Sequence, residues 1–269
     1  MRLSFFGGAK TVTGTNYLLE ISKRKILIDC GLFQGALFQM KNREPFPYNP
    51  REIDAVIITH AHLDHTGRLP KLVKEGFKGK IFATPPTLDL TKLVLEDALK
   101  LSHRSYQKRN RDALFFSQKD LRKTLGLFEP AEYHRKIKIF PEISFKFLDA
   151  GHILGSAIIE LYLKAKDMRQ DIIKIIFSGD LGNPPTPLLK PTELPDSADY
   201  ILIESTYGDE VHQGFLKRKD LLEDTIEGTI KNGGVLMIPS MPDAWGPARS
   251  SELNELVENH RIPKVPIFI

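Results

Sequence analysis

The segment THAHLDHTG, residues 59–67, places three of the chain's eight histidines and one aspartate within six consecutive positions. His60 and His62 are two residues apart at an expected strand end, where side-chain alternation sends both imidazoles to one side. Asp64 and His65 follow at once, and a turn here would aim a carboxylate and a third imidazole at a second ion. Imidazole and carboxylate ligands without thiolates suit a catalytic Zn²⁺, and Mn²⁺ or Fe²⁺ would also accept them. The segment is therefore predicted to bind metal, the alternative being a polar loop that is merely rich in histidine.

Other segments would have to complete such a site, because four residues are too few to hold two metal ions. The segment DAGHILGSA places His152 in a turn between two apolar strands, and FSGDLG places Asp180 after another strand. Each of these residues, taken alone, could be an ordinary loop or turn residue. Asp29, at the end of KILID, could orient a ligand histidine by accepting its distal N–H, or could simply cap a turn.

Strands that could position these residues recur along the chain as short runs rich in Ile, Val, Leu and Phe. The first two hundred residues are therefore predicted to form stacked sheets with flanking helices, an α/β fold. The expected strands are Leu3–Phe6, Tyr17–Ile21, Lys25–Asp29, Asp54–Thr59, Lys80–Ala83, Phe145–Asp149, Ala157–Leu163, Ile172–Phe177 and Tyr200–Glu204.

Helices are expected between and after these strands. Apolar residues recur at helical spacing from Leu90 to Leu101, and Thr87 is a reasonable N-cap for that helix. Another helix is expected from Phe215 to about Lys231. After it, VLMIP is predicted to be a buried strand, and a second helix and a final apolar run, KVPIFI, follow.

Length and composition set the outer limits. The 269 residues, of which 41% are hydrophobic, suffice for one large domain or a domain and a half. No run reaches signal-peptide character at the start or the roughly 20 apolar residues of a membrane span, so we expect a cytoplasmic protein without membrane contact. A single cysteine, Cys30, cannot form an internal disulfide and fits a reducing compartment.

Basic residues are concentrated in one part of the chain. The whole sequence has 38 basic and 34 acidic residues, but residues 101–140 contain ten basic and four acidic ones. Such a segment could neutralise the phosphates of a nucleic acid, the alternative being a solvated helical hairpin. The basic residues are Arg104, Lys108, Arg109, Arg111, Lys119, Arg122, Lys123, Arg135, Lys136 and Lys138.

Taken together, these motifs resemble a known family. The order of Asp29, the HAHLDH motif, His152 and Asp180 resembles the metallo-β-lactamase superfamily. DAGHILGSA, SGDLG and ESTYGD, with the early TVTGTNYLLE, are similar to its β-CASP branch of RNA-processing nucleases, which includes messenger-RNA 3′-end cleavage factors. The resemblance covers residues 1 to about 240. It implies an αββα sandwich with a dinuclear zinc site at one edge of the sheets.

The resemblance also implies roles for individual residues. One zinc ion would be bound by His60, His62 and His152. The other would be bound by Asp64 and His65, with Asp180 bridging the two ions. The resemblance implies that Asp64 is also a catalytic residue.

Two further roles concern the chemistry on RNA. Paired zinc ions lower the pKa of a shared water and bind phosphodiester oxygens, so the resemblance implies metal-dependent hydrolysis of RNA that leaves a 5′-phosphate. Glu204 would be a catalytic acidic residue that helps position a proton-donating histidine, or an ordinary strand-end carboxylate. Ser156 could donate to a phosphate oxygen, or be an ordinary strand-edge serine.

The resemblance also divides the chain. Residues 1–205 would form the metallo-β-lactamase domain without its completing C-terminal segment, and residues 206–269 the beginning of an incomplete β-CASP domain. Residues 241–252 depart from the family pattern, and neither His212 nor His260 lies in the motif of a proton-donating or zinc-binding histidine. We therefore expect a truncated form with an incomplete second zinc site and impaired activity.

Two alternatives stay open at this point. One is another hydrolase of the same fold that acts on a thioester, a lactone or DNA, although ESTYGD and AGHILGSA favour RNA. The other is a non-catalytic subunit that supports an active relative. The expected partners are RNA and either a second copy of the chain or a related β-CASP subunit.

Overall fold

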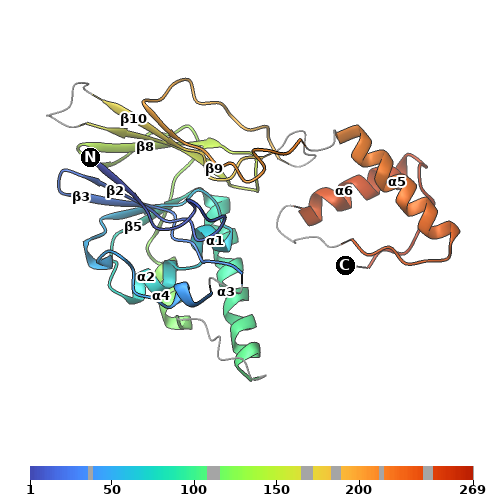
Figure 1. Cartoon of the computed structure of the whole chain (residues 1–269), viewed down its shortest axis with the longest axis horizontal. Coiled ribbons are helices and arrows are strands. Elements are labelled where there is room, and N and C mark those ends of the chain that lie inside the picture. Colours follow the sequence, from blue (N-terminus) through green and yellow to red (C-terminus); the bar gives the residue numbers. More distant parts are fainter. Residues whose placement is uncertain are drawn as a thin grey trace.

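A computed structural model describes residues 1–35, 39–107, 116–164, 172–182, 189–211, 215–238 and 245–268. Two β-sheets lie face to face, and helices cover the outer side of the first sheet (Figure 1). These helices are α1 Leu63–Thr66, α2 Leu69–Lys74, α3 Pro85–Gln107 and α4 Gln118–Leu125. Two later helices, α5 Phe215–Lys231 and α6 Trp245–Glu258, are set apart from the sheets (Figure 1).

The first sheet has six strands in sequence order. Its first three strands are antiparallel, and the pairs from β3 to β6 are parallel, so helices connect the later strands. The strands are β1 Arg2–Phe5, β2 Tyr17–Ile21, β3 Arg24–Ile28, β4 Ala55–Ile57, β5 Lys80–Ala83 and β6 Phe128–Pro130.

The second sheet has five strands in the order β11-β10-β9-β8-β7. Strands β7 to β10 are antiparallel neighbours, and β11 pairs in parallel with β10. The strands are β7 Ile137–Phe140, β8 Ile143–Asp149, β9 Ala157–Leu163, β10 Ile173–Phe177 and β11 Tyr200–Leu202.

The core lies between the two sheets and beneath the helices. Ile26 and Ile28 of β3 face Phe145 and Phe147 of β8 in the cluster between the sheets, whereas Leu27 packs in the cluster beneath the helices. Strand β3 is therefore buried on both faces, which explains its unbroken apolar sequence. The predicted α/β fold with stacked sheets and flanking helices is confirmed.

The basic segment is divided among different elements. Lys119, Arg122 and Lys123 are exposed on α4, whereas Lys136 and Lys138 lie at β7 of the second sheet. The alternative that residues 101–140 form a single helical hairpin is therefore wrong. Lys108, Arg109 and Arg111 lie outside the described residues, as does His212.

The N-terminus of α3 differs from the prediction. The helix begins at Pro85, and the Thr87 N–H donates to Thr84 Oγ1 at 3.3 Å. Thr84 is therefore the capping side chain, and the prolines at the first two helical positions lack only N–H groups that the helix leaves unused. The hydroxyls of Thr84 and Thr87 both donate to the carbonyl of Gly155, at 2.7 and 2.8 Å, which joins the start of the helix to the loop that carries His152.

The prediction for VLMIP is wrong. Residues 235–238 form no strand, and Val235 and Met237 are 89% and 83% exposed. The described part of KVPIFI, residues 264–268, also forms no strand. An apolar run becomes a strand only where another strand pairs with it, and no described strand lies beside these runs.

The two later helices were both expected. Helix α5 has the predicted bounds, and α6 packs against it through Ile226, Leu256 and Ile262. Of the described helices, none combines the length and the apolar character needed to cross a membrane.

Candidate metal centre

A short loop between β4 and α1 presents His60 and His62 of the THAHLDH motif, and α1 itself carries His65. His60 and His62 both lie beyond the end of β4, and His62 occupies the N-cap position of α1. Their rings meet because the loop turns, not because a strand alternates, so the predicted reason was wrong. The Thr66 hydroxyl lies within hydrogen-bonding distance of the carbonyl oxygens of Ala61 and His62, at 3.1 and 2.9 Å, which holds the turn closed.

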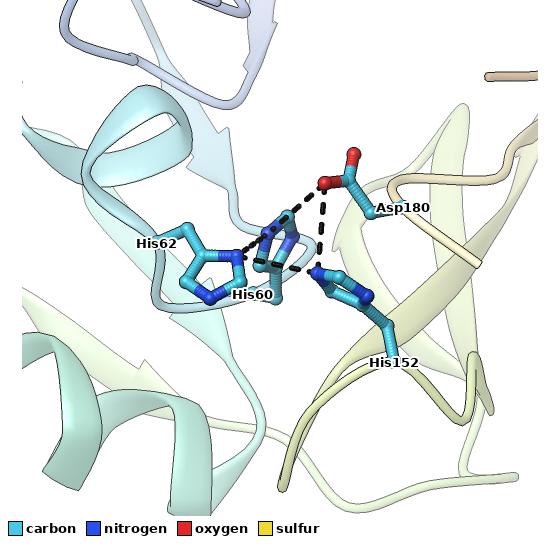
Figure 2. Close-up of side chains that lie close together, drawn as sticks. All are labelled: His60, His62, His152 and Asp180. Carbon is cyan, nitrogen blue, oxygen red and sulfur yellow. Dashed lines mark hydrogen bonds and ion pairs between the residues drawn. The ribbon is translucent and has the colours of Figure 1, made fainter. Parts of the chain in front are cut away.

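Four side chains converge on one point (Figure 2). His62 Nδ1 lies 2.9 Å from His60 Nε2 and 3.2 Å from His152 Nε2. Asp180 Oδ2 lies 3.7 Å from His60 Nε2 and 3.6 Å from His152 Nε2. All four ligand atoms lie within 4.8 Å of one another. We call these residues, His60, His62, His152 and Asp180, the three-histidine group.

The spacing of the three-histidine group matches that of metal ligands. Four tetrahedral ligands at a Zn–N distance of about 2.1 Å are separated from each other by roughly 3.4 Å. Four of the six separations, from 2.9 to 3.7 Å, lie around this value, and all six lie within 4.8 Å. Three imidazole nitrogens and one carboxylate oxygen are also a donor set that divalent ions of the first transition row accept. The residues present therefore fit a divalent metal ion.

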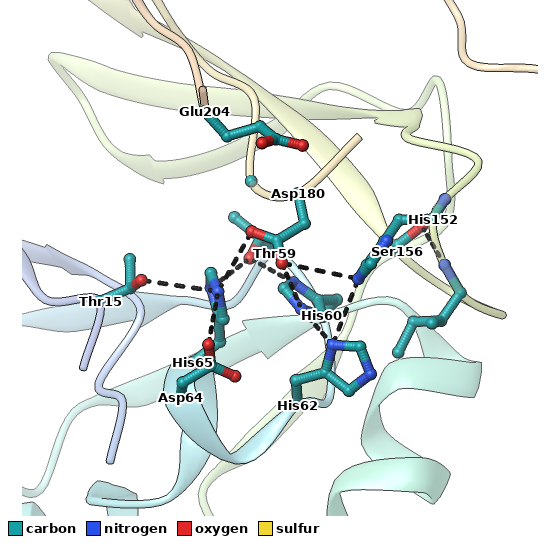
Figure 3. Close-up of polar contacts among 12 residues, drawn as sticks. Thr15, Thr59, His60, His62, Asp64, His65, His152, Ser156, Asp180 and Glu204 are labelled. Atoms are coloured by element: carbon teal, nitrogen blue, oxygen red, sulfur yellow. Dashed lines mark hydrogen bonds and ion pairs between the residues drawn. The ribbon is translucent and has the colours of Figure 1, made fainter. Parts of the chain in front are cut away.

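A second group lies on the other side of the Asp180 carboxylate. Asp180 Oδ1 is 3.3 Å from His65 Nε2, and His65 Nε2 is 3.9 Å from Asp64 Oδ2. The two oxygens of one carboxylate thus face different groups (Figure 3). The structure brings all six sequence-predicted ligand residues together, with Asp180 between the two sets.

Asp29 and Thr59 hold the second group from behind. Asp29 Oδ2 lies 2.7 Å from His65 Nδ1 and also accepts the Thr59 hydroxyl at 2.8 Å, while Oδ1 accepts the Thr59 N–H at 2.8 Å. The Thr59 hydroxyl also lies 3.1 Å from His60 Nδ1. Because Nδ1 of His65 faces a carboxylate, its Nε2 is the nitrogen available on the Asp180 side.

Thr59 and Thr15 are two residues that sequence reasoning missed. Thr59 connects both groups from its position directly before His60. Thr15 Oγ1 lies 3.5 Å from His65 Nε2, and the Thr15 N–H donates to the Asp64 carbonyl at 2.9 Å. The first threonine of THAHLDH was a usable signal, because its hydroxyl stands beside the ligands. For Thr15 the sequence offered no signal beyond its place in TVTGTNYLLE.

The loop that carries His152 is held by Ser156. Its Oγ accepts the N–H groups of His152 and Ile153, at 3.0 and 3.2 Å. Ser156 is only 1% exposed. This burial does not support the predicted contact with a substrate phosphate, and the hydrogen bonds indicate that Ser156 positions His152.

Glu204 holds the loop that carries Asp180. Its Oε1 accepts the N–H of Leu181 at 3.0 Å, and its backbone N–H donates to Ser178 Oγ at 3.0 Å. Leu181 follows Asp180 directly, so Glu204 restrains the carboxylate that lies between the two groups. The close approach of this loop to Thr59 requires Gly179, whose φ is +55° and whose Cβ would lie 2.8 Å from the Thr59 side chain.

Burial and neighbouring charges set the protonation of these groups. Burial and then the adjacent imidazoles lower the pKa of His60 well below its usual value, and burial lowers the pKa of His152 to about 4. Burial raises the pKa of Asp180, but the hydrogen bond and charge of His65 outweigh it and lower that pKa. Neutral imidazoles and an ionised carboxylate are the forms that bind metal.

His65 differs from the other histidines. Burial lowers its pKa, but the carboxylates of Asp29 and Asp180 outweigh this and raise that pKa well above its usual value. Without a metal ion, His65 therefore carries a proton between two carboxylates. A metal ion on the Asp64 side has to displace that proton.

Sequence comparisons agree with this geometry. The family model described as the metallo-beta-lactamase superfamily matches residues 10–114. The chain is 37% identical over 271 residues to "Ribonuclease TTHA0252" of Thermus thermophilus, which covers all of this chain and 58% of that protein.

Two other relatives come from archaea. The chain is 33% identical over 282 residues to "Transcription termination factor FttA" of Methanosarcina mazei, covering all of this chain and 41% of that protein. It is 31% identical over 274 residues to "RNase J-like protein" of Methanocaldococcus jannaschii, covering 99% of this chain and 57% of that protein. The chain thus spans about two fifths to three fifths of the length of these relatives.

The matched family and the names of the relatives agree with the converging histidines and aspartates. The chain carries a metallo-β-lactamase superfamily domain, and its similarity to these relatives is consistent with the β-CASP branch of that superfamily.

Proposed function

We propose that this chain is the metal-binding part of a ribonuclease that hydrolyses phosphodiester bonds of RNA with two divalent metal ions. The observation that carries the proposal is the position of Asp180. Its Oδ2 faces His60 and His152, and its Oδ1 faces His65. A carboxylate between two sets of ligands is the arrangement expected where two ions are bridged.

The ligand sets of the proposal follow from these contacts. His60, His62 and His152 would hold one ion, Asp64 and His65 would hold the other, and Asp180 would be shared by both. Zinc is the proposed metal because imidazole and carboxylate donors without thiolates suit it, and Mn²⁺ or Fe²⁺ are the proposed substitutes. When bound, two such ions supply Lewis acidity toward phosphate oxygens and lower the pKa of a shared water.

The protein's own residues position these groups. Asp29 keeps the Nε2 of His65 directed at the site, and Ser156 fixes the backbone of His152. Glu204 fixes the loop of Asp180 and is proposed as a positioning residue. The catalytic role of Asp64, and that of Glu204 in positioning a proton-donating histidine, stay predictions.

RNA is proposed as the substrate from the relatives. Two of them are named as ribonucleases or ribonuclease-like, and the third is named as a transcription termination factor. We further propose a boundary near residue 205, with residues 206–269 belonging to a β-CASP domain. Its support is that the last strand of the second sheet ends at Leu202 and α5 begins at Phe215.

Elemental analysis and cleavage assays on the purified chain test the proposal. We expect bound divalent metal and slow, metal-dependent cleavage of a 5′-labelled single-stranded RNA, with still less cleavage of matched DNA or of a thioester. Asp180→Asn should abolish RNA cleavage, whereas Asp97→Asn, an exposed aspartate on α3, should leave it unchanged. Failure to bind any divalent metal, or preferred hydrolysis of the thioester, would contradict the proposal.

A further inference from the structure

A basic pocket lies at one end of the second sheet, away from the metal centre. Its volume is about 340 Å³, and its lining includes Lys136, Lys138, Tyr162 and Lys164. Strand β9 begins beside the His152 loop and ends at Leu163. At about 3.3 Å per residue, its seven residues place the pocket roughly 20 Å from the metal ligands. The pocket is therefore a separate site.

Three lysines of this pocket present unneutralised charge. Lys136, Lys138 and Lys164 are all exposed. Within the described part of the chain, none of their ammonium groups forms an ion pair with a carboxylate. Three acidic groups accompany them: Glu142, which lines the pocket and lies 3.7 Å from Arg24, Glu160, which accepts the Tyr162 hydroxyl at 2.9 Å, and Asp196, whose charge acts on Tyr162. Positive charge therefore dominates the surface of the pocket.

Further lysines continue the charge toward the metal centre. Lys146 and Lys174 both pair with the buried carboxylate of Glu160, at 2.6 and 2.5 Å. Two cations share one anion here, so this part of the sheet also keeps an excess positive charge. Lys146 is opposite Glu160, two residues nearer the His152 end than Tyr162, whereas Lys174 is opposite Tyr162 of the pocket itself.

Aromatic rings accompany the cations. The Lys136 ammonium lies 3.8 Å from the centre of the Tyr162 ring, and the Arg24 guanidinium lies 4.0 Å from the Phe140 ring. Such contacts orient a cation without neutralising it. Proteins that bind single-stranded nucleic acid combine a positively charged groove with aromatic side chains, and both are present here.

We propose that this pocket is a second RNA contact, which binds the phosphodiester backbone of a single strand about six nucleotides from the metal centre. The spacing follows from roughly 20 Å at about 3.4 Å per stacked nucleotide. The inference rests on the proposed function, because it takes RNA as the substrate. It adds to that function a second surface, which holds the RNA strand at a distance from the bond that is cleaved.

Salt-dependent RNA binding by matched variants tests the proposal. The pocket variant combines Lys136→Ala, Lys138→Ala and Lys164→Ala. The control combines Lys119→Ala, Arg122→Ala and Lys123→Ala, which removes three exposed charges from α4 instead. Binding of a fluorescein-labelled oligouridylate is measured by anisotropy over a series of salt concentrations. Gel electrophoresis verifies that the probe stays intact, and circular dichroism verifies that each variant is folded.

We expect the pocket variant to bind RNA more weakly. The slope of log affinity against log salt should become less steep by about 2, because each of the three lost phosphate contacts removes about 0.7 for a single strand. The α4 control should keep the parent slope. Equal slopes for the two variants would contradict the proposed RNA contact at the pocket and leave the RNA substrate of the proposed function untouched. If the parent chain did not bind RNA, both the proposed contact at the pocket and the RNA substrate of the proposed function would be contradicted.

Discussion

Replacing Asp29 with asparagine would test how the second group is held, because the exchange changes one buried charge and hardly changes the shape of the side chain. Asp29 is 1% exposed and has a φ of +59°. Asparagine tolerates this left-handed conformation better than most residues, so the backbone should not shift. Its amide oxygen can still accept the Thr59 N–H, which donates to Asp29 Oδ1 at 2.8 Å.

The expected effect is on the tautomer of His65. Asp29 Oδ2 lies 2.7 Å from His65 Nδ1, so once a metal ion has displaced the proton on Nε2, the carboxylate keeps the remaining ring proton on Nδ1. An asparagine NH₂ group in that place would donate to Nδ1 and move the ring proton to Nε2, which faces Asp180. Loss of such a supporting carboxylate typically costs 10- to 100-fold in metal affinity, about 1.4 to 2.7 kcal/mol.

Metal affinity is measured by competition between the protein and a metallochromic chelator as zinc is added. We expect one ion to keep nearly the parent affinity, because Asp29 reaches the ligand His60 through the Thr59 hydroxyl rather than directly, and the other to weaken. Nitrogen-15 NMR of the histidine rings reports the tautomer. Asp54→Asn is the control, since that carboxylate accepts Lys25 N–H and Arg24 donors away from the site. Unchanged affinity for both ions, with the proton still on His65 Nδ1, would refute the reasoning.

Three further predictions concern the ligands and the loop that carries His152. His60→Ala combined with His62→Ala should remove one of the two bound ions, which elemental analysis would detect; retention of both would exclude these residues as ligands. Affinity for the ion at His65 should rise with pH through the neutral range, because the Asp29 and Asp180 carboxylates outweigh burial and raise the pKa of His65, so that metal competes with a proton. A pH-independent affinity in calorimetric titrations would contradict this. Ser156→Ala should destabilise the fold by about 1 to 3 kcal/mol, because it leaves the N–H groups of His152 and Ile153 without their acceptor. Chemical denaturation measures this loss, and an unchanged midpoint would contradict it.

Most strands could be predicted from sequence because their signal is local. The predicted bounds of Tyr17–Ile21, Lys80–Ala83 and Ala157–Leu163 agree with β2, β5 and β9. In each case a short apolar run is also buried against another sheet or a helix layer, so local composition and tertiary environment agree. VLMIP has the same composition without a partner strand, and the prediction failed there.

The helix cap shows a different limit. Thr87 and Thr84 both offer a hydroxyl near two prolines, and sequence alone favoured the one closer to the apolar repeat. Both hydroxyls donate to the carbonyl of Gly155, about seventy positions further along the chain, at 2.7 and 2.8 Å. Thr84 is the cap because the helix begins at Pro85, so that the Thr87 N–H lies in the first turn and donates to Thr84 Oγ1.

The sequence by itself determined which residues the site contains. Imidazoles and carboxylates in THAHLDH, DAGHILGSA and FSGDLG are rare enough in combination to predict metal binding, because that chemistry depends on residue type and short spacing. Only the tertiary structure decided how they face each other. The separation of the two oxygens of Asp180 between His152 and His65 depends on how two sheets pack, and so do the burial of Ser156 and the gathering of Lys136 and Lys164 around Tyr162. These contacts join residues far apart in the chain, and their distances follow from the whole fold, which no local pattern encodes.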